Sequence, residues 1–302
     1  MIASAFCMFG CGSTGGPAVH RTSWLGAQDG TPEPAGDSVL QSQDLEPGPR
    51  NPADGPTAQE RILARLSAHE PLYFAVGFQG RDNARFQYSF ACKFLNPEGD
   101  LVQRHPWIEG FHFGFSQTSF WDLESSSVPF LDSSYRPGLF WRDQRIEDWS
   151  SDSLNTGIEL GFEHESNGKD GLESRSTNIA YLKPRLDWAI GDSTHFVVEP
   201  KVWAYLDKGD KNPDIAEFRG HFNLRLNAYD EDGLGVSSDM RLGNNSDRGY
   251  LQIDMTYPMQ KLFSGDFEGF LLVQYVNGWG ESILGYDRKG PSQIRIGFSL
   301  IR

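Results

Sequence analysis

From about residue 70 to the end of the chain, apolar and polar residues alternate with a period of two. In residues 84–94 an apolar series alternates with a polar one: Phe86, Tyr88, Phe90, Cys92 and Phe94 against Arg85, Gln87, Ser89 and Lys93. The same holds in residues 292–300: Ile294, Ile296, Phe298 and Leu300 against Gln293, Arg295, Gly297 and Ser299. Successive side chains of a strand point to opposite faces, so this pattern predicts strands with one apolar and one polar face.

Segments of this kind recur along the chain and are separated by turn-rich stretches such as "YDEDGLG" and "GNNSDRG". The predicted strands are 70–79, 84–94, 109–123, 134–143, 154–166, 174–190, 194–206, 215–229, 232–243, 247–257, 266–279 and 292–300. An even number of strands of about ten residues is typical of membrane barrels. The sequence therefore predicts an all-β fold, a 12-stranded antiparallel transmembrane β-barrel over residues 70–302.

Alternation also fits a soluble β-sandwich or lipocalin-like barrel, because it does not tell which face points inward. Two features favour the membrane barrel. Long strands end in aromatic residues, as interface girdles do: Trp121, Trp141, Trp188, Trp203 and Trp279. The polar faces also carry charges of both signs, as a packed hydrophilic interior would. No run of about 18 or more apolar residues occurs that would form a spanning helix.

The rest of the chain limits the class of protein. Residues 1–57 contain a stretch rich in Gly, Pro, Ser and Asp, which predicts a largely disordered leader. Its apolar first residues leave open a signal remnant, a lipoprotein signal ending at Cys11 or a plain disordered tail. A short helix is expected over residues 58–69, with Thr57 as N-cap and Glu60 three residues later. The net charge of −14 argues against a nucleic-acid partner. Three cysteines suggest neither a disulfide framework nor a metal site.

One stretch, "FEHESNGKDGLESRSTN" (162–178), places polar residues where alternation predicts apolar ones. His164 and Ser166 share the apolar face of their strand with Phe162, and Asn178 shares the apolar face of the next strand. Polar groups that face lipid are costly unless they satisfy each other. We therefore expect Ser166 as nucleophile, His164 as general base and Asn178 as its orienter, acting on the surrounding lipids. The alternative is that these are ordinary rim residues beside an Asn-Gly turn.

This stretch resembles the active-site segment of the outer-membrane phospholipase A family, whose pattern is His-x-Ser-Asn-Gly followed by Ser-Arg-Ser-x-Asn. The segments "FSQTSFWDL" (115–123), "SSSVPF" (125–130), "NPDI" (212–215) and "GWGESILGYD" (278–287) resemble family segments in the same order. The resemblance implies a twelve-stranded barrel in the bacterial outer membrane. It also implies a calcium-dependent phospholipase A1/A2 that hydrolyses phospholipid acyl esters as a homodimer.

The resemblance also assigns further residues. The Gly168 backbone N–H would stabilise the oxyanion. Ca²⁺ would be held by the Ser174 hydroxyl, the Lys169 carbonyl and the Ser127 carbonyl of the second chain; oxygen ligands suit this cation. Gln117, an amide within an apolar stripe, is expected at the dimer interface. Gly171 and Lys211 stand where acids of a second calcium site are expected, so the likeness does not extend to that site.

Two other functions keep the same barrel. A porin-like channel would use the His164 region merely as a rim. A non-catalytic lipid-binding barrel would result if the calcium site has been lost.

Overall fold

The computed structural model describes residues 55, 57–78, 84–127, 129–245, 247–263 and 267–302. All of them belong to one compact unit, Gly55–Arg302. The predicted leader, residues 1–57, lies outside the described residues except for Gly55 and Thr57.

The described part of the chain begins with helix α1 (Ala58–Leu63). The Glu60 N–H donates to the Thr57 hydroxyl at 3.2 Å, and the Thr57 N–H donates to the Glu60 carboxylate at 2.7 Å. This capping box starts the helix at the expected place. The helix ends at Leu63 rather than at residue 69, because β1 (Leu66–Ser67) already pairs with another strand.

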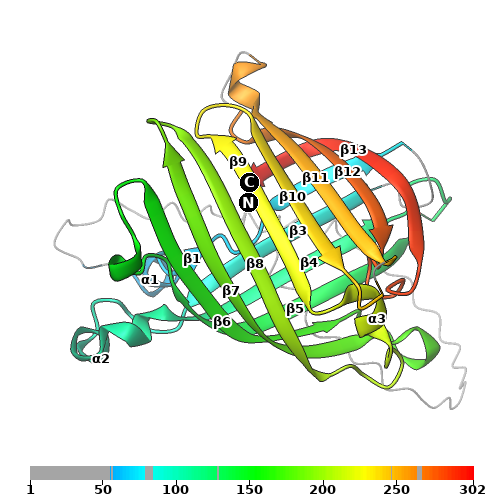
Figure 1. Ribbon diagram of the computed structural model, residues 1–302, viewed down its shortest axis with the longest axis horizontal. Coiled ribbons are helices and arrows are strands. Elements are labelled where there is room, and N and C mark those ends of the chain that lie inside the picture. Colours follow the sequence, from blue (N-terminus) through cyan, green and yellow to red (C-terminus); the bar gives the residue numbers. More distant parts are fainter. Residues whose placement is uncertain (1–54, 56, 79–83, 128, 246, 264–266) are drawn as a thin grey trace, which may run out of the picture. The chain divides into compact units, whose positions relative to one another are not determined.

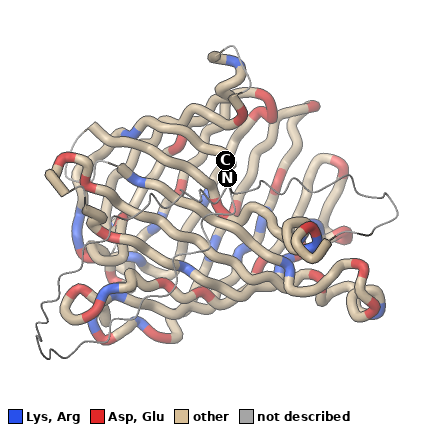
Figure 2. Tube along the Cα trace, turned by 180° about the vertical axis from the view of Figure 1, so that it is seen from behind, with Lys and Arg blue, Asp and Glu red and all other residues tan. Residues whose placement is uncertain are grey.

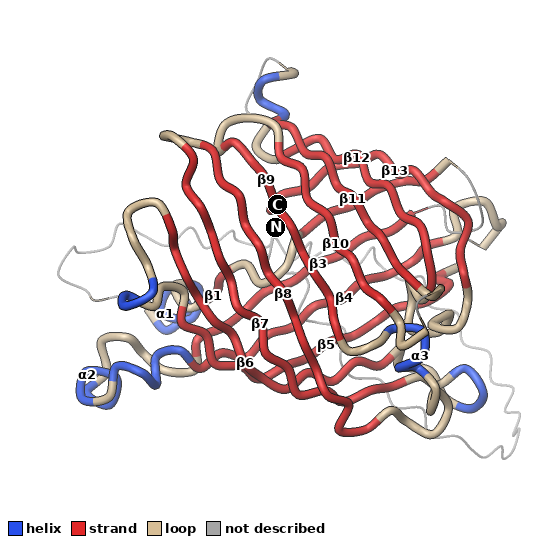
Figure 3. Tube along the Cα trace, viewed as in Figure 1, coloured by secondary structure: helices blue, strands red, loops and turns tan. Residues whose placement is uncertain are grey.

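Twelve further strands form a closed antiparallel ring within the described residues (Figures 1 and 3). They are β2 (Leu72–Gly77), β3 (Ala84–Lys93), β4 (Phe111–Trp121), β5 (Phe130–Asp143), β6 (Leu154–Ser166), β7 (Ser176–Ile190), β8 (Thr194–Asp207), β9 (Phe222–Asp230), β10 (Gly235–Leu242), β11 (Gly249–Pro258), β12 (Phe270–Trp279) and β13 (Lys289–Ile301). Each strand pairs with the next, and β13 pairs with β2 to close the ring. The predicted twelve-stranded barrel is confirmed.

The closing seam between the first and last strands of the ring depends on one glycine. Gly297 of β13 pairs with Ala75 of β2. A Cβ at Gly297 would lie 1.9 Å from the Phe74 carbonyl oxygen. Only glycine allows the two backbones to approach this closely at that point.

The apolar faces of the strands lie on the outside of the barrel. In β13 the side chains of Ile294, Ile296, Phe298 and Leu300 are 43–54 % exposed. The alternating Gln293, Arg295 and Ser299 are at most 3 % exposed. This is the reverse of a soluble barrel, which buries its apolar face, and it is the arrangement of a barrel wall that contacts lipid.

The inside of the barrel, the lumen, is filled by charged and polar side chains. Lys and Arg are interspersed with Asp and Glu along the chain (Figure 2). The charges inside are largely paired: Arg142 and Lys183 both contact Glu159, at 2.5 and 2.9 Å. A cavity of about 500 Å³ remains between them. Such pairing reduces the cost of removing each charge from water.

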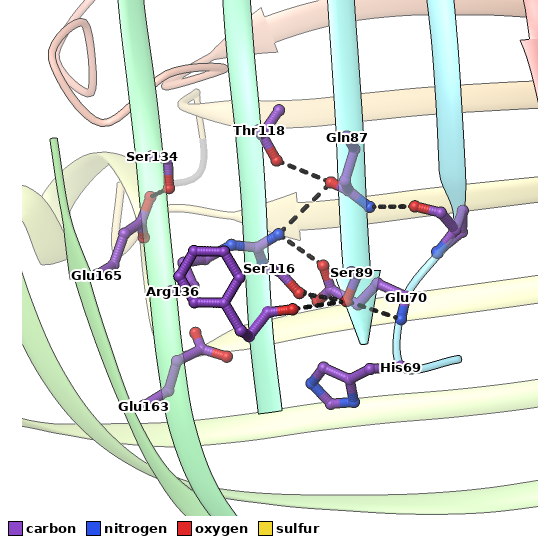
Figure 4. Close-up of polar contacts among 12 residues, drawn as sticks. His69, Glu70, Gln87, Ser89, Ser116, Thr118, Ser134, Arg136, Glu163 and Glu165 are labelled. Carbon is purple, nitrogen blue, oxygen red and sulfur yellow. Dashed lines mark hydrogen bonds and ion pairs between the residues drawn. The ribbon is translucent and has the colours of Figure 1, made fainter. Parts of the chain in front are cut away.

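A lumen network is organised by the linker between β1 and β2 (Figure 4). Glu70 of this linker receives two hydrogen bonds from the Arg136 guanidinium of β5, at 2.6 and 3.2 Å. The Glu70 N–H donates to the Ser89 hydroxyl at 3.2 Å, and Gln87 Nε2 donates to the Pro71 carbonyl at 3.0 Å. The linker is thus held inside the barrel against β3 and β5.

Two expectations about the strands are wrong. Residues 215–219, predicted as the start of a strand, form helix α3 (Ile215–Arg219), and β9 begins only at Phe222. The helix buries Ile215, Ala216 and Arg219 and ends at Gly220, whose φ is +61°. Trp203 was expected in an outer girdle, but it lines the lumen and packs against buried residues there. It has the parity of Lys201 and Glu199, which also face inward.

The remaining short helices lie in the connections between strands. They are α2 (Asp100–Arg104), η2 (Pro106–Gly110), η3 (Glu147–Trp149), η4 (Gly171–Glu173) and η5 (Met259–Lys261). Among the described residues, no helix has the length and apolar character needed to cross a membrane. Because consecutive strands are antiparallel neighbours, the β4–β5, β6–β7 and β8–β9 connections share one end of the barrel, here called the site end.

Candidate active site

Residues 162–178, in which polar side chains occupy the apolar faces of two strands, form the hairpin of β6 and β7. His164 of β6 pairs directly with Asn178 of β7, and Ser166 pairs with Ser176. His164 and Ser166 have the parity of Phe162, which is 61 % exposed on the outer wall. The strand pairing therefore places the expected base and orienter side by side on the outer wall, where β6 approaches the site end.

His164 and Asn178 are joined by a hydrogen bond. The distance from His164 Nδ1 to the Asn178 amide oxygen Oδ1 is 2.8 Å. An amide oxygen only accepts, so Nδ1 carries the proton and Nε2 is the unprotonated nitrogen of the neutral ring. The hydrogen bond thus selects the tautomer in which Nε2 is free to take a proton.

Ser166 is near this pair but is not bonded to it. It lies two residues beyond His164 on the same face of β6, which places the two Cα atoms roughly 6–7 Å apart. No hydrogen bond among the described residues joins its hydroxyl to the imidazole. Catalytic contacts are often loose without substrate and tighten when it binds.

The carboxylates that neighbour this site in sequence point the other way. Glu163 contacts Lys201 at 3.1 Å and Glu165 contacts Arg219 at 2.8 Å, both inside the barrel. Glu165 also accepts a hydrogen bond from Ser134 (Figure 4). Both acids are therefore occupied in the lumen and do not reach the outer wall.

The loop after β6 is shaped by Asn167, whose role the alternation pattern does not indicate. Its side chain is 4 % exposed and bonds three backbone groups: it donates to the Glu173 carbonyl at 2.8 Å and accepts from the N–H groups of Lys169 and Arg175, at 3.4 and 3.0 Å. The next residue, Gly168, has φ +67°, which explains the Asn-Gly pair. The Gly168 N–H makes no hydrogen bond within the described chain.

A second buried amide holds the start of β7. Asn212, in the β8–β9 connection, is fully buried. Its side chain donates to the carbonyls of Ser176 and Lys208 and accepts from the Ser176 N–H at 3.3 Å. Ser176 is the partner of Ser166 across the hairpin. In the sequence, Asn212 is marked by the "NPDI" segment, but that segment does not indicate the contact between Asn212 and Ser176.

The residues expected to hold calcium lie at the site end. Lys169 turns its ammonium group to the Leu131 carbonyl at 3.2 Å and to Glu173 at 3.0 Å. Its own carbonyl oxygen and the Ser174 hydroxyl have no hydrogen-bond partner in the described part of the chain. Both oxygens are therefore available to a hard cation, so the residues present fit Ca²⁺. Ser127 is exposed in the β4–β5 connection at the same end.

At the two positions where acids of a second calcium site are expected, the described residues are a glycine and a lysine. Gly171 has φ +60° with open space around it, and Lys211 is exposed. The described residues contain no group of three or more His, Cys, Asp or Glu that could hold a metal ion.

Gln117 lies on β4 with its amide bonded within the chain. The Tyr88 hydroxyl donates to the Gln117 amide oxygen, and Gln117 Nε2 donates to the Ser119 hydroxyl at 3.0 Å. Tyr88 is the partner of Gln117 across the β3–β4 pair. These two contacts use one acceptor and one donor position of the amide, and Tyr88 holds it in a defined orientation.

The sequence of this chain is similar to those of known phospholipases. A family model described as Phospholipase A1 matches residues 65–300. A putative phospholipase A1 of Neisseria meningitidis serogroup B is 29 % identical over 248 residues, covering 80 % of this chain and 57 % of that protein. The chain thus spans little more than half the length of that relative. The phospholipase A1 of Escherichia coli (strain K12) is 28 % identical over 230 residues, covering 73 % of this chain and 70 % of the relative.

Solved structures share the fold. The outer membrane phospholipase A from Escherichia coli superposes with a TM-score of 0.64 at 22 % identity, covering 80 % of this chain and 96 % of that chain. A Salmonella typhi outer membrane phospholipase, solved as a dimer with bound calcium, gives 0.63 at 22 % identity, covering 78 % and 92 %. With the apolar outer wall, these findings confirm the predicted family and the bacterial outer membrane as its location. The chain belongs to the phospholipase A1 family of outer-membrane β-barrels.

Proposed function

We propose that this chain hydrolyses the acyl ester bonds of phospholipids and lysophospholipids, as a phospholipase A1/A2. The observation that carries the proposal is the hydrogen bond between His164 and Asn178 on the lipid-facing wall. A base with a chosen tautomer, two residues from a serine, is the arrangement that nucleophilic acyl transfer needs. On this wall, membrane lipids are the substrates within reach.

The chemistry follows from the roles of three side chains. Ser166 Oγ attacks the ester carbonyl while His164 Nε2 accepts its proton. His164 then returns the proton to the leaving oxygen of the lysophospholipid, and an acyl group remains on Ser166. A water molecule, deprotonated by the same nitrogen, releases the fatty acid and restores the serine. Asn178 accepts from the Nδ1–H throughout and stabilises the charged ring.

The oxyanion needs donors aimed at the attacked carbonyl. The Gly168 N–H lies two residues beyond Ser166 and is free within the described chain. Its positive φ and the Asn167 contacts fix its direction without a side chain in the way. The Tyr135 ring lies beside Gly168 and limits the space for any larger residue there.

We further propose that activity depends on Ca²⁺ and on a homodimer. Ser174 Oγ and the Lys169 carbonyl would hold the ion together with the Ser127 carbonyl of a second copy. A bound Ca²⁺ would supply positive charge and an ordered water beside the oxyanion. Support comes from the two free oxygens in the β6–β7 loop and from the calcium-bound dimer of the Salmonella typhi relative.

The calcium proposal predicts a shift in ion dependence. Ser174→Ala is expected to raise the calcium concentration needed for half-maximal activity by about tenfold, since one oxygen ligand is lost. Fatty-acid release, measured across a calcium titration, gives this value. Ser153→Ala, an exposed serine at the opposite end of the barrel, should behave as the unaltered protein. An unchanged titration for Ser174→Ala would remove this residue from the site.

The dimer proposal predicts that Gln117→Leu lowers the fraction of dimers trapped by cross-linking in detergent. The amide on the outer wall, oriented by Tyr88, is the group expected to bond across the seam. Gln103→Leu, an exposed amide at the other end, is the matched control. Full activity in a sample that shows no dimer would contradict the requirement for a second copy.

The lumen gives less support to a porin-like channel. Glu70 and Arg136 bridge the β1–β2 linker and β5 inside the barrel, and much of the remaining lining is ion-paired. The hydrolase is tested by fatty-acid release from mixed phospholipid–detergent micelles containing calcium. Solute flux through reconstituted protein without fatty-acid release would instead support the channel. Lipid binding without either activity would support a non-catalytic barrel.

A further inference from the structure

A third polar residue continues the row formed by His164 and Asn178. Asp207, the last residue of β8, pairs with Asn178 in the β7–β8 register. Asn178 Nδ2 donates to Asp207 Oδ2 at 3.3 Å. His164, Asn178 and Asp207 therefore stand in one line across three neighbouring strands.

Asp207 reaches this row through a β-bulge. Tyr205 pairs with Ile179, but Asp207 pairs with Asn178, so Leu206 is an extra residue on β8. By strict alternation Asp207 would share the lumen face of Trp203 and Tyr205. The bulge turns it to the outer wall, where the hydrogen bond to Asn178 is made. Bulges beside functional sites commonly redirect one side chain in this way.

The contact decides which way the Asn178 amide faces. An amide has a donor end and an acceptor end, whereas a carboxylate only accepts. The amide NH₂ must therefore face Asp207, and its oxygen faces His164 Nδ1. The opposite orientation would present NH₂ to Nδ1 and favour the tautomer with the proton on Nε2. That tautomer cannot accept the Ser166 proton.

Asp207 is itself held in place. Its other oxygen, Oδ1, accepts a hydrogen bond from the Gly209 N–H at 3.0 Å. Gly209 has φ +69°, and a Cβ there would lie 2.7 Å from the Ser176 carbonyl oxygen. The turn after β8 therefore fixes one oxygen of the carboxylate and leaves the other for Asn178.

We propose that Asp207 is a positioning residue that orients the Asn178 amide, and through it selects the His164 tautomer required for proton transfer. The inference rests on the proposed hydrolase function. It adds a carboxylate that acts behind the asparagine, without itself touching the imidazole or the substrate.

The test compares two substitutions of similar size. Asp207→Leu removes the acceptor and is expected to lower kcat by about tenfold with little change in KM. Asp207→Asn keeps a single acceptor oxygen, which the Gly209 N–H already engages, so its NH₂ would face Asn178 and kcat is expected to remain low. Activity is measured at saturating calcium, so that any effect of charge on calcium binding is suppressed. Asp210→Leu removes an exposed carboxylate from the same loop and should leave kcat unchanged.

A second background separates orientation of the amide from general support of the loop. In Asn178→Asp protein, residue 178 has two equivalent oxygens and no amide to misorient. Asp207→Leu should then cost no further kcat. An equal loss in both backgrounds, or an unchanged kcat for Asp207→Leu in the native background, would overturn the proposal. If Ser166→Ala retains activity, the hydrolase mechanism itself fails. If Ser166→Ala is inactive but the Asp207 variants have the kcat of the native protein, only the role of Asp207 fails.

Discussion

Ser166→Ala is expected to lower fatty-acid release by roughly 10⁴-fold or more, to the background of the assay. In the proposed mechanism the Ser166 hydroxyl forms the acyl-enzyme, and neither His164 nor Asn178 can replace it. The folded barrel should be unaffected, because the Ser166 hydroxyl has no hydrogen-bond partner within the described residues. Release is measured from mixed micelles with calcium, and folding by the shift in electrophoretic mobility between unheated and heated samples.

A neighbouring serine provides the control for this experiment. Ser176→Ala alters the residue opposite Ser166 on β7 and removes a hydroxyl from the same hairpin. Its backbone contacts with Asn212 remain, so most of the activity should survive. Fatty-acid release by Ser166→Ala at the rate of the native protein would exclude the serine mechanism. A folded but inactive Ser166→Ala that still binds lipid would agree with it.

Arg136→Leu is expected to lower the free energy of unfolding of the barrel. It leaves the Glu70 carboxylate without the two hydrogen bonds that hold it, close to the further carboxylates Glu163 and Glu165 (Figure 4). Breaking a buried pair on one side costs about 3–5 kcal/mol. The side chains of Arg136 and Glu70 are 19 % and 17 % exposed, so the lower end, about 3 kcal/mol, is expected. Urea unfolding of the barrel in lipid vesicles measures this change.

Two further variants identify the cause of that loss. Replacing both partners, Arg136→Leu with Glu70→Leu, removes the uncompensated charge and should recover much of the stability. Arg145→Leu breaks an exposed pair, whose side chains are 45 % and 78 % exposed, and should change the free energy of unfolding by less than about 1 kcal/mol. A double variant no more stable than Arg136→Leu would show that packing, rather than charge, explains the effect.

The barrel was predictable because its strands are amphipathic over long stretches. Alternation identified the twelve strands of the ring, and parity placed His164 and Asn178 on corresponding faces of one hairpin. It failed at residues 215–219, where Ala216 and Phe218 imitate a strand while Ile215, Ala216 and Arg219 are buried by a single helical turn. Pro213 before this segment and Gly220 after it were the local signs that the strand begins later.

Other features of the site depend on contacts between distant segments. The Asn212 side chain reaches Ser176 across 36 positions in the sequence. The bulge at Leu206 reverses the face of Asp207, and no local pattern marks it. The sequence predicts a helix over residues 58–69 and a strand over 70–79, so it does not indicate that the linker with Glu70 lies in the lumen. That position depends on its partner Arg136, which lies 66 residues further along the chain. Alternation cannot locate contacts of this kind.

Strand β6 serves two compartments with a single run of residues. Glu163 and Glu165 form ion pairs with Lys201 and Arg219 in the lumen. The alternate residues His164 and Ser166 face the lipid. A one-residue insertion or deletion just before this segment would exchange the two sets, placing carboxylates against hydrocarbon and the imidazole inside the barrel. Length changes in β6 are therefore tolerable only in steps of two. The length of this strand is therefore constrained by the protein structure itself, in units of two residues.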